Sequence, residues 1–237
     1  MPVELTAPSK IDLWCYDLSE KLKGACFDDL SVSEKTRAEG IKFPLDRDRW
    51  VKARIFLRRV LSEITNVSPN KVVLTSEPGG KPVSSFGPPV QFNLSHSGDI
   101  AAVVTSSSNA VGVDVEASSQ RPSMLAAIER WALSDAESQE VEGLLECQRP
   151  DALFTAWRRK EALLKGVGIG LRYPLVKLDV GSLCRPFSKA VVGPAGSKPS
   201  ELWRIYDVPV CERYAIAVAA QGTSHVLSIH DQSVAFQ

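Results

Sequence analysis

Apolar and polar residues follow each other along the first half of the chain in a pattern that predicts helices and strands. Residues 11–16 alternate as a strand does, and the capping-box spacing of Ser31 and Glu34 predicts a short helix over 33–41. Asp46 is expected to cap a long helix whose apolar residues recur every three or four positions. Further strands are expected at 72–74, 90–94, 100–105 and 110–116.

The second half repeats this order of helices and then strands. Helices are expected over 123–133, from a Ser134 and Glu137 capping box towards residue 147, and from Pro150 to Gly166. Further strands are expected around 176–180, 202–208, 214–220 and 226–230. This order predicts an α+β fold of two similar lobes, each a small antiparallel sheet packed with helices, although no sequence repeat proves the similarity. We place the lobes at 1–109 and 110–237.

Composition narrows the class of protein without identifying a function. A chain of 237 residues with 44% hydrophobic residues can bury one large core or two smaller ones. Its 28 basic and 28 acidic residues cancel, so neither nucleic acid nor an acidic membrane surface is expected as a partner. Five scattered cysteines without a Cys-x-x-Cys pair, no leader-like N-terminus and no apolar stretch of about 18 residues predict a cytoplasmic protein.

Two carboxylates share one face of the strand expected at 110–116. The three valines of this strand face one way, so Asp114 and Glu116 point the other way, with Cα atoms roughly 6 to 7 Å apart. Like charges side by side repel at a cost of up to about 1 kcal/mol unless a cation lies beside them. Alternatively, both carboxylates are solvated because they lie at the end of the strand. The pattern alone favours neither a bound cation nor solvation.

A third carboxylate lies on the helix that is expected to end at Gly166. Glu161 is four residues after Trp157 and four before Lys165, so the three side chains project from one side of that helix. A surface ion pair with Lys165, worth about 0.3 kcal/mol, would explain Glu161 when the helix is considered alone. A shared metal ion is the second explanation.

Basic side chains lie near turns and on helices where an anion could bind. A Gly-Gly pair before Lys81 could turn backbone amides towards a phosphate. Alternatively, the two glycines only form the tight turn of a hairpin, with Lys81 exposed to solvent. His96 follows Ser95 in a Ser-His-Ser segment, and a single loop histidine is more often structural than catalytic. Arg49 and Lys160 lie on basic helices, whose charges mostly need no explanation beyond solvation.

Taken together, these groups point to chemistry on a phosphoanhydride. Asp114, Glu116 and Glu161 are hard oxygen ligands that suit Mg²⁺, with waters and phosphate oxygens completing its coordination. Carboxylates, a divalent cation and basic groups are typical of phosphoryl-transfer sites. Two other motifs fail. The Gly-x-Gly-x-Gly run from Gly166 follows a helix instead of joining a strand to a helix, so it is not a dinucleotide-binding loop. The Ser-His-Ser segment is not accompanied by the Gly-x-Ser-x-Gly elbow of a serine hydrolase.

Four blocks in order resemble the signature of the 4′-phosphopantetheinyl transferases, in the class that activates polyketide and nonribosomal peptide synthetases. These blocks are Gly79-Gly80-Lys81-Pro82, Phe92-Asn93-Leu94-Ser95-His96-Ser97, Gly112-Val113-Asp114-Val115-Glu116 and Trp157-Arg158-Arg159-Lys160-Glu161-Ala162-Leu163-Leu164-Lys165. The basic stretch that contains Arg49 is also similar to an early helix of that family. The ends of the chain are less diagnostic.

The resemblance implies a monomer of two lobes related by a pseudo-twofold axis, with coenzyme A in the cleft between them. It implies transfer of the phosphopantetheine arm to a serine of an acyl, aryl or peptidyl carrier protein, with release of adenosine 3′,5′-bisphosphate. Asp114, Glu116 and Glu161 would hold Mg²⁺, and Glu161 is the favoured general base, with a metal-bound water left open as the alternative. Lys165 would contact the pyrophosphate. The groups expected around the nucleotide and its 3′-phosphate are Arg49, Lys81, Ser95 and His96. Lys160 and Lys35 are further candidates for these contacts.

Two other functions remain open from the sequence. A regulatory protein could bind coenzyme A without chemistry, although the acidic and lysine positions are complete. A Mg²⁺-dependent nucleotide phosphohydrolase would release the bisphosphate without any carrier protein. The sequence does not name the carrier or indicate whether acylated coenzyme A is accepted.

Overall fold

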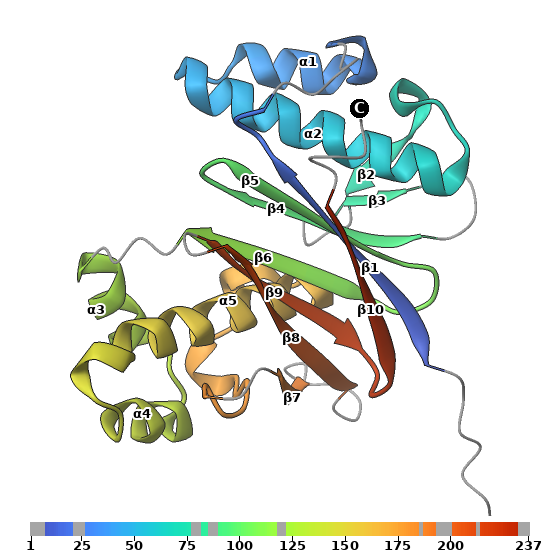
Figure 1. Cartoon of the computed structure of the whole chain (residues 1–237). Coiled ribbons are helices and arrows are strands. Elements are labelled where there is room, and N and C mark those ends of the chain that lie inside the picture. The colour runs from blue at the N-terminus through green and yellow to red at the C-terminus, as the bar shows by residue number, and fades with distance from the viewer. Residues whose placement is uncertain are drawn as a thin grey trace, which may run out of the picture.

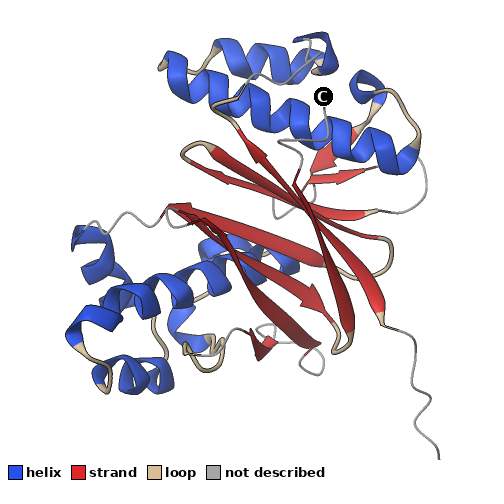
Figure 2. Ribbon diagram, viewed as in Figure 1, coloured by secondary structure: helices blue, strands red, loops and turns tan. Residues whose placement is uncertain are grey.

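The protein folds into four layers, with helices on the outside and two β-sheets facing each other inside (Figures 1 and 2). The computed structural model describes residues 8–20, 27–76, 82–84, 90–117, 122–184, 187–192, 201–211 and 214–231. The predicted α+β class is confirmed, since each lobe contains a four-stranded sheet covered by helices.

The first sheet combines strands from the start, the middle and the end of the chain. Its order is β10 (His225–Asp231), β1 (Ser9–Asp17), β5 (Ile100–Ser106) and β4 (Gln91–Ser97). β1 pairs antiparallel with β5 but parallel with β10. The last strand therefore returns to the first lobe, although the division made from sequence assigned all of 110–237 to the second.

The second sheet contains four antiparallel strands. Its order is β6 (Val111–Ala117), β9 (Tyr214–Gln221), β8 (Glu201–Cys211) and β7 (Phe187–Val192). β7 was not predicted, and the strand expected at 176–180 is wrong. A 3-10 turn at Leu175–Lys177 leads into a loop in which Leu178 and Val180 are buried and Asp179 is exposed. The alternation is real, but it belongs to a loop that packs on the core of this lobe.

Two helices lie on the outer side of the first sheet, the longer one packed on the sheet and the shorter one packed on that helix (Figure 1). α1 (Val32–Glu39) begins with the predicted capping box, because Ser31 accepts from the Glu34 amide and Glu34 accepts from the Ser31 amide. α2 (Pro44–Thr65) begins one residue after Phe43, so Asp46 lies in its first turn and does not cap it. The buried side of α2 packs on β4 and β5, and a separate hairpin of β2 (Leu74–Ser76) and β3 (Pro82–Ser84) lies nearby.

Three helices cover the second sheet. These are α3 (Pro122–Trp131), α4 (Asp135–Glu142) and α5 (Arg149–Val167), and α4 begins with the predicted Ser134 and Glu137 capping box. α5 ends at Val167 and is capped by Gly168, which has a φ of 83°, so the helix does not end at Gly166 as expected. Short 3-10 turns complete the described secondary structure at Phe27–Asp29, Pro69–Lys71, Glu146–Gln148 and Gly170–Arg172.

An apolar layer fills the space between the two sheets. Ile11, Leu13 and Val104 of the first sheet pack with Val113 and Val218 of the second, and all five are fully buried. Since alternate residues of a strand face opposite sides, the valines of β6 turn towards the first sheet, and the acidic residues between them turn towards α5. Within the described residues, none of the helices has the length and apolar character needed to cross a bilayer.

Candidate functional site

β6 and α5 approach each other closely where two glycines meet. A Cβ atom at Gly112 would lie 2.1 Å from a carbonyl oxygen of α5 and 2.3 Å from the backbone nitrogen of Gly166. A Cβ atom at Gly166 would lie 2.6 Å from the ring of Trp203. All three distances are far below van der Waals contact, so each position has room only for glycine. This contact brings the next residues on that face of β6, Asp114 and Glu116, beside α5.

Asp114 is the most buried acid of the site, with 3% of its surface exposed. Its Oδ1 atom accepts from Lys165 Nζ over 2.6 Å and from Ser95 Oγ over 3.2 Å. Lys165 Nζ also donates to Ser95 Oγ over 3.0 Å. Burial raises the pKa of Asp114, and the positive charge of Lys165 opposes that rise. The Oδ2 atom is buried without a hydrogen-bond partner among the described residues, so the carboxylate has spare capacity for a cation or donor.

Glu116 continues the acidic face of β6 and is held from two sides. Trp157 Nε1 on α5 donates to Oε1 over 3.2 Å, and Ser97 Oγ on β4 donates to Oε2 over 3.4 Å. Burial raises the pKa of Glu116, and the negative charge of Asp114 raises it further. The two strand carboxylates therefore repel each other, as their spacing predicted.

Glu161 faces these acids from α5. Burial raises the pKa of Glu161 to about 7; Lys165 lowers it, while Asp114 and Glu116 raise it. The side chain is therefore close to half-protonated near neutral pH and can take up a proton there. In the described structure, Lys165 forms its ion pair with Asp114 and not the surface pair with Glu161 that the helix alone suggested.

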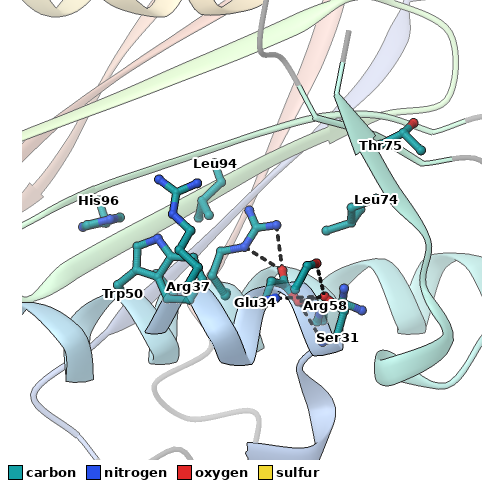
Figure 3. A pocket seen from close by; sticks show the side chains of 12 residues that line it. Ser31, Glu34, Arg37, Trp50, Arg58, Leu74, Thr75, Leu94 and His96 are labelled. Atoms are coloured by element: carbon teal, nitrogen blue, oxygen red, sulfur yellow. Dashed lines mark hydrogen bonds and ion pairs between the residues drawn. The ribbon is translucent and has the colours of Figure 1, made fainter. Parts of the chain in front are cut away.

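His96 lies on β4 beside a pocket of about 440 Å³ in the first lobe (Figure 3). The pocket also contains the guanidinium of Arg37, which lies 5.5 Å from the ring centre of Trp50. Arg54 and Arg58 reach the same pocket but are bound by Glu34 (Figure 3). The pocket therefore offers a cation and an aromatic face to a ligand, with the charge of its other two arginines partly neutralised.

The charge state of His96 depends on its cationic neighbours. Burial lowers the pKa of His96, and Lys165 and Arg49 lower it further. These influences favour the neutral imidazole, which can donate or accept a hydrogen bond. Arg49 donates from Nε and Nη2 to Asp99 Oδ1 over 2.8 and 2.7 Å, which places it at the turn that follows β4.

Three lysines predicted to bind phosphate lie elsewhere or cannot be placed. Lys160 is fully buried and forms an ion pair with Glu137, so the expectation that it binds the nucleotide needs correction. Its amine faces the core of the second lobe because residue 160 lies about 100° around the helix from Glu161. Lys35 forms an ion pair with the exposed Asp28 over 2.7 Å. Lys81 lies outside the described residues.

The acids do not by themselves form a metal centre. Within the described residues, no group of three or more His, Cys, Asp or Glu side chains is placed to hold a metal ion. Burial raises the pKa of Asp114, Glu116 and Glu161, the three acids add to one another's negative charge, and Asp114 Oδ2 has no hydrogen-bond partner among the described residues. An added cation would suit this cluster chemically, provided that other ligands completed its coordination.

Several residues around the acids were not identified from sequence. The spacing of Trp157 placed it on the same side of the helix as Glu161, but it did not show that the indole N–H donates to Glu116. Ser97 binds the same carboxylate, and Asn93 accepts from the amide of Val113. The sequence of β4 carried a signal for these contacts, because polar residues occupy every second position from Gln91 to Ser97. One face of this strand is therefore polar and could hydrogen-bond to a neighbouring element.

Two family models match consecutive parts of this chain. Residues 20–108 match the N-terminal domain of 4′-phosphopantetheinyl transferase, and residues 110–219 match the 4′-phosphopantetheinyl transferase superfamily. The second match contains the acids of β6 and the whole of α5. The first match contains β4 and the pocket beside His96.

Individual proteins with this enzyme name are also similar to the chain. The transferase psf-1 of Bacillus pumilus is 33% identical over 149 residues, which are 62% of this chain and 61% of that protein. AcpT of Salmonella typhimurium is 34% identical over 133 residues, 56% of this chain and 65% of that protein. HetI of Nostoc sp. is 28% identical over 198 residues, 81% of this chain and 79% of that protein. The first two alignments thus span less than two thirds of the relative's length.

Proposed function

Because the chain belongs to the 4′-phosphopantetheinyl transferase superfamily, we propose that it transfers the phosphopantetheine arm of coenzyme A to a serine of a carrier protein. The observation that carries this proposal is the convergence of Asp114, Glu161 and Lys165 from β6 and α5. A cluster of carboxylates with one lysine suits a reaction in which a hydroxyl loses a proton while a phosphoanhydride breaks.

In the proposed reaction, the serine oxygen of the carrier forms a bond to the phosphorus that bears the pantetheine arm. The bond from that phosphorus to the bridging oxygen of the pyrophosphate breaks, and adenosine 3′,5′-bisphosphate leaves. The serine proton passes to Glu161, the carboxylate of α5 that faces the two acids of β6 and whose pKa burial raises to about 7 in the metal-free protein. Lys165 lies beside Asp114 and is placed to bind the pyrophosphate as negative charge moves to the leaving group.

We propose that Asp114, Glu116 and Glu161 hold Mg²⁺ together with oxygens of the pyrophosphate. When bound, the metal would neutralise charge on the transferring phosphate. The spare Oδ2 atom of Asp114 and the raised pKa values of all three acids support this assignment. Trp157 and Ser97 would hold Glu116 in place, so that its carboxylate need not be ordered by the ligand.

The nucleotide end of coenzyme A is proposed to lie in the first lobe, along β4 and the pocket beside His96. Ser95 is shared between Asp114 and Lys165, and His96 follows it on the strand, so the two residues connect the acids with the pocket. Arg49 lies at the turn after β4 and would bind the 3′-phosphate if Asp99 released or shared it. Lys81 stays a candidate for the same role.

The proposed partners are acyl, aryl and peptidyl carrier proteins, including those of polyketide, nonribosomal peptide and fatty acid synthesis. We propose that the protein acts as a monomer, because one chain supplies all the side chains assigned to the reaction. We also propose a cytoplasmic location, with which the free Cys15, Cys147 and Cys184 agree. No partner subunit is needed to complete the proposed site.

The test incubates the purified protein with an apo carrier protein, coenzyme A and MgCl₂, and measures the intact mass of the carrier. We expect the carrier to gain one phosphopantetheine arm. A carrier whose acceptor serine is replaced by alanine should gain nothing, and a folded Glu161→Gln variant should load the carrier far more slowly.

Two other results would replace the proposal. Binding of coenzyme A without any mass gain on several carriers would favour a regulatory protein. Release of the bisphosphate in the absence of a carrier would favour a Mg²⁺-dependent phosphohydrolase. Near-normal turnover by Glu161→Gln would leave the transferase but remove the assignment of Glu161 as base.

A further inference from the structure

β4 and β6 are edge strands of different sheets, and their edges meet at the site. β4 is the last strand in the order of the first sheet, and β6 is the first strand of the second. β6 pairs with β9 along one edge only. Every second backbone N–H group of β6 therefore points away from β9 and has no partner within its own sheet. An edge with unpaired donors that is buried in the protein requires other acceptors.

Side chains of β4 supply these acceptors in a regular series. Asn93 Oδ1 accepts from the Val113 amide over 3.1 Å, Ser95 Oγ from the Val115 amide over 3.3 Å, and Ser97 Oγ from the Ala117 amide over 3.4 Å. Each acceptor lies 20 residues before its donor, so the two strands run side by side in one fixed register. We call Asn93, Ser95 and Ser97 the polar ladder.

The two serines of the polar ladder also bind the acids that β6 carries. Ser95 Oγ donates to Asp114 over 3.2 Å, and Ser97 Oγ donates to Glu116 over 3.4 Å. A hydroxyl has one proton to donate and two lone pairs to accept with, so a single serine can bind both the backbone and the neighbouring carboxylate. The same atoms therefore fix the strand and aim its acidic side chains.

The apolar layer between the sheets cannot supply this register. Its contacts are between aliphatic side chains such as Leu13 and Val113, and such contacts have little directional preference. Hydrogen bonds depend strongly on distance and angle. A displacement along the strand that keeps the apolar layer buried would still break the bonds of the polar ladder.

We propose that the polar ladder sets the position of Asp114 and Glu116 relative to His96, and that Asn93 and Ser97 are positioning residues for phosphopantetheine transfer. The consequence for transfer rests on the proposed function, whereas the register itself does not. His96 and the two serines lie on one strand, with His96 turned towards the nucleotide pocket and the serines towards the acids. β4 would thus keep the two ends of coenzyme A at a constant separation.

The first experiment compares Ser97→Ala with Ser97→Thr, which keeps the hydroxyl. Ser106→Ala is the matched control, because Ser106 Oγ also accepts from backbone amides, those of Ser108 and Asn109, but binds no acid of the site. We expect Ser97→Ala to lower kcat for carrier loading about 10-fold, with Ser97→Thr largely restored and Ser106→Ala close to wild type. The free energy of unfolding should fall by a similar amount in Ser97→Ala and Ser106→Ala.

Hydrogen exchange gives a second readout that needs no catalysis. The amide of Ala117 should exchange faster in Ser97→Ala, and that of Val113 faster in Asn93→Leu, each by about 10-fold or more relative to amides in β8. If Ser97→Ala does not fold, Asn93→Leu still tests the polar ladder through the Val113 amide. In Ser97→Ala the Val113 amide should stay better protected than the Ala117 amide, and in Asn93→Leu the order should be reversed.

The outcomes separate the two proposals. Unchanged amide exchange in both variants would overturn the polar ladder, whether or not the wild type loads carriers. Faster exchange with unchanged kcat would overturn the positioning role and leave only a structural one. If the wild type loads no carrier, the proposed function fails, while the exchange data still decide whether the polar ladder holds the register.

Discussion

Lys165 Nζ lies 2.6 Å from Asp114 Oδ1, and this ion pair joins α5 to β6 at the centre of the proposed site. The partners differ in environment, since Asp114 is almost fully buried whereas about a third of the Lys165 side chain is exposed. A buried carboxylate without a cation is costly, so the lysine stabilises the acid in the free protein. The same amine remains accessible to a substrate phosphate.

We expect Lys165→Met to destabilise the protein at pH 7 by about 2 kcal/mol, because it leaves Asp114 buried and unpaired. The loss should diminish at acidic pH, where Asp114, whose pKa is already raised by burial, becomes protonated. Lys165→Arg keeps the charge and should lose less stability. Denaturant unfolding of the three proteins at several pH values measures this difference, and equal stability at pH 7 would show that the pair contributes nothing.

The raised pKa of Glu161 predicts a pH-dependent cost to the metal-free fold. Its folded-state pKa of about 7 exceeds the ordinary value of 4.5, so the folded protein binds more protons than the unfolded chain between these values. The cost therefore appears as pH rises from 4.5 to 7 and is complete above 7. Glu161→Gln should raise the metal-free stability by roughly 1 kcal/mol at pH 8 and leave it unchanged below pH 4.5.

Thermal unfolding in the presence of a chelator tests this expectation, with the exposed Glu146→Gln as control. A rise in Tm of about 2 to 4 °C at pH 8 corresponds to the expected change for a chain of this size. If Glu161→Gln instead lowers Tm at pH 8, Glu161 makes a favourable contact that outweighs its repulsion by Asp114 and Glu116.

The contact between Gly112 and Gly166 predicts an unusually high cost for a single methyl group. Gly166→Ala would place Cβ 2.6 Å from the ring of Trp203, which is itself buried. We expect a loss of about 2 kcal/mol or more and a displacement of α5 relative to β6, because a packed core does not absorb a clash of this size. Gly143→Ala is the control, since its Cβ would meet only ordinary contacts at 3.5 Å and beyond.

Circular dichroism and denaturant unfolding measure the stabilities of these two variants. Carrier loading then reports whether the site moved. Gly166→Ala should lose more transfer activity than its folded fraction explains, whereas Gly143→Ala should retain it. Equal behaviour of the two variants would show that the helix and strand can separate without consequence for the site.

The sequence could place the acids of the candidate site in pairs because each pairing depends on local geometry. A period of two puts Asp114 and Glu116 on one face of a strand, and a spacing of four puts Glu161 and Lys165 on one side of a helix. Both relations hold within a single element. Which elements then meet depends on contacts between distant parts of the chain, such as Gly112 against Gly166, and no local pattern encodes such a contact.

The position of β10 and the partners of β4 were missed for the same reason. Alternation shows which face of a strand is buried but not which strand lies beside it, so the parallel pairing of β10 with β1 could not be read from residues 225–231. Likewise, Ser97 carries a hydroxyl that could bind water, a carboxylate or a backbone amide. Only the meeting of two sheet edges selects the last two.

Lys160 is the residue that sequence reasoning placed wrongly, and its actual surroundings yield the last prediction. Its amine is fully buried and donates to Glu137 and to the carbonyl oxygens of Ala132 and Leu175. Glu137 also accepts from the amide of Val180, so this ion pair connects α5 with α4 and with the loop before β7. Burial lowers the pKa of Lys160, and the carboxylate of Glu137 opposes that change.

We expect Lys160→Met to destabilise the protein by roughly 3 to 5 kcal/mol, because it leaves the Glu137 carboxylate buried without its cation. The double variant Lys160→Met/Glu137→Gln removes that charge and keeps an oxygen acceptor for Val180, so it should recover part of the loss. The affinity of the folded double variant for coenzyme A, measured by calorimetry, should match that of the wild type. A 10-fold weaker affinity with unchanged stability would instead return Lys160 to the nucleotide site, against the direction in which its amine points.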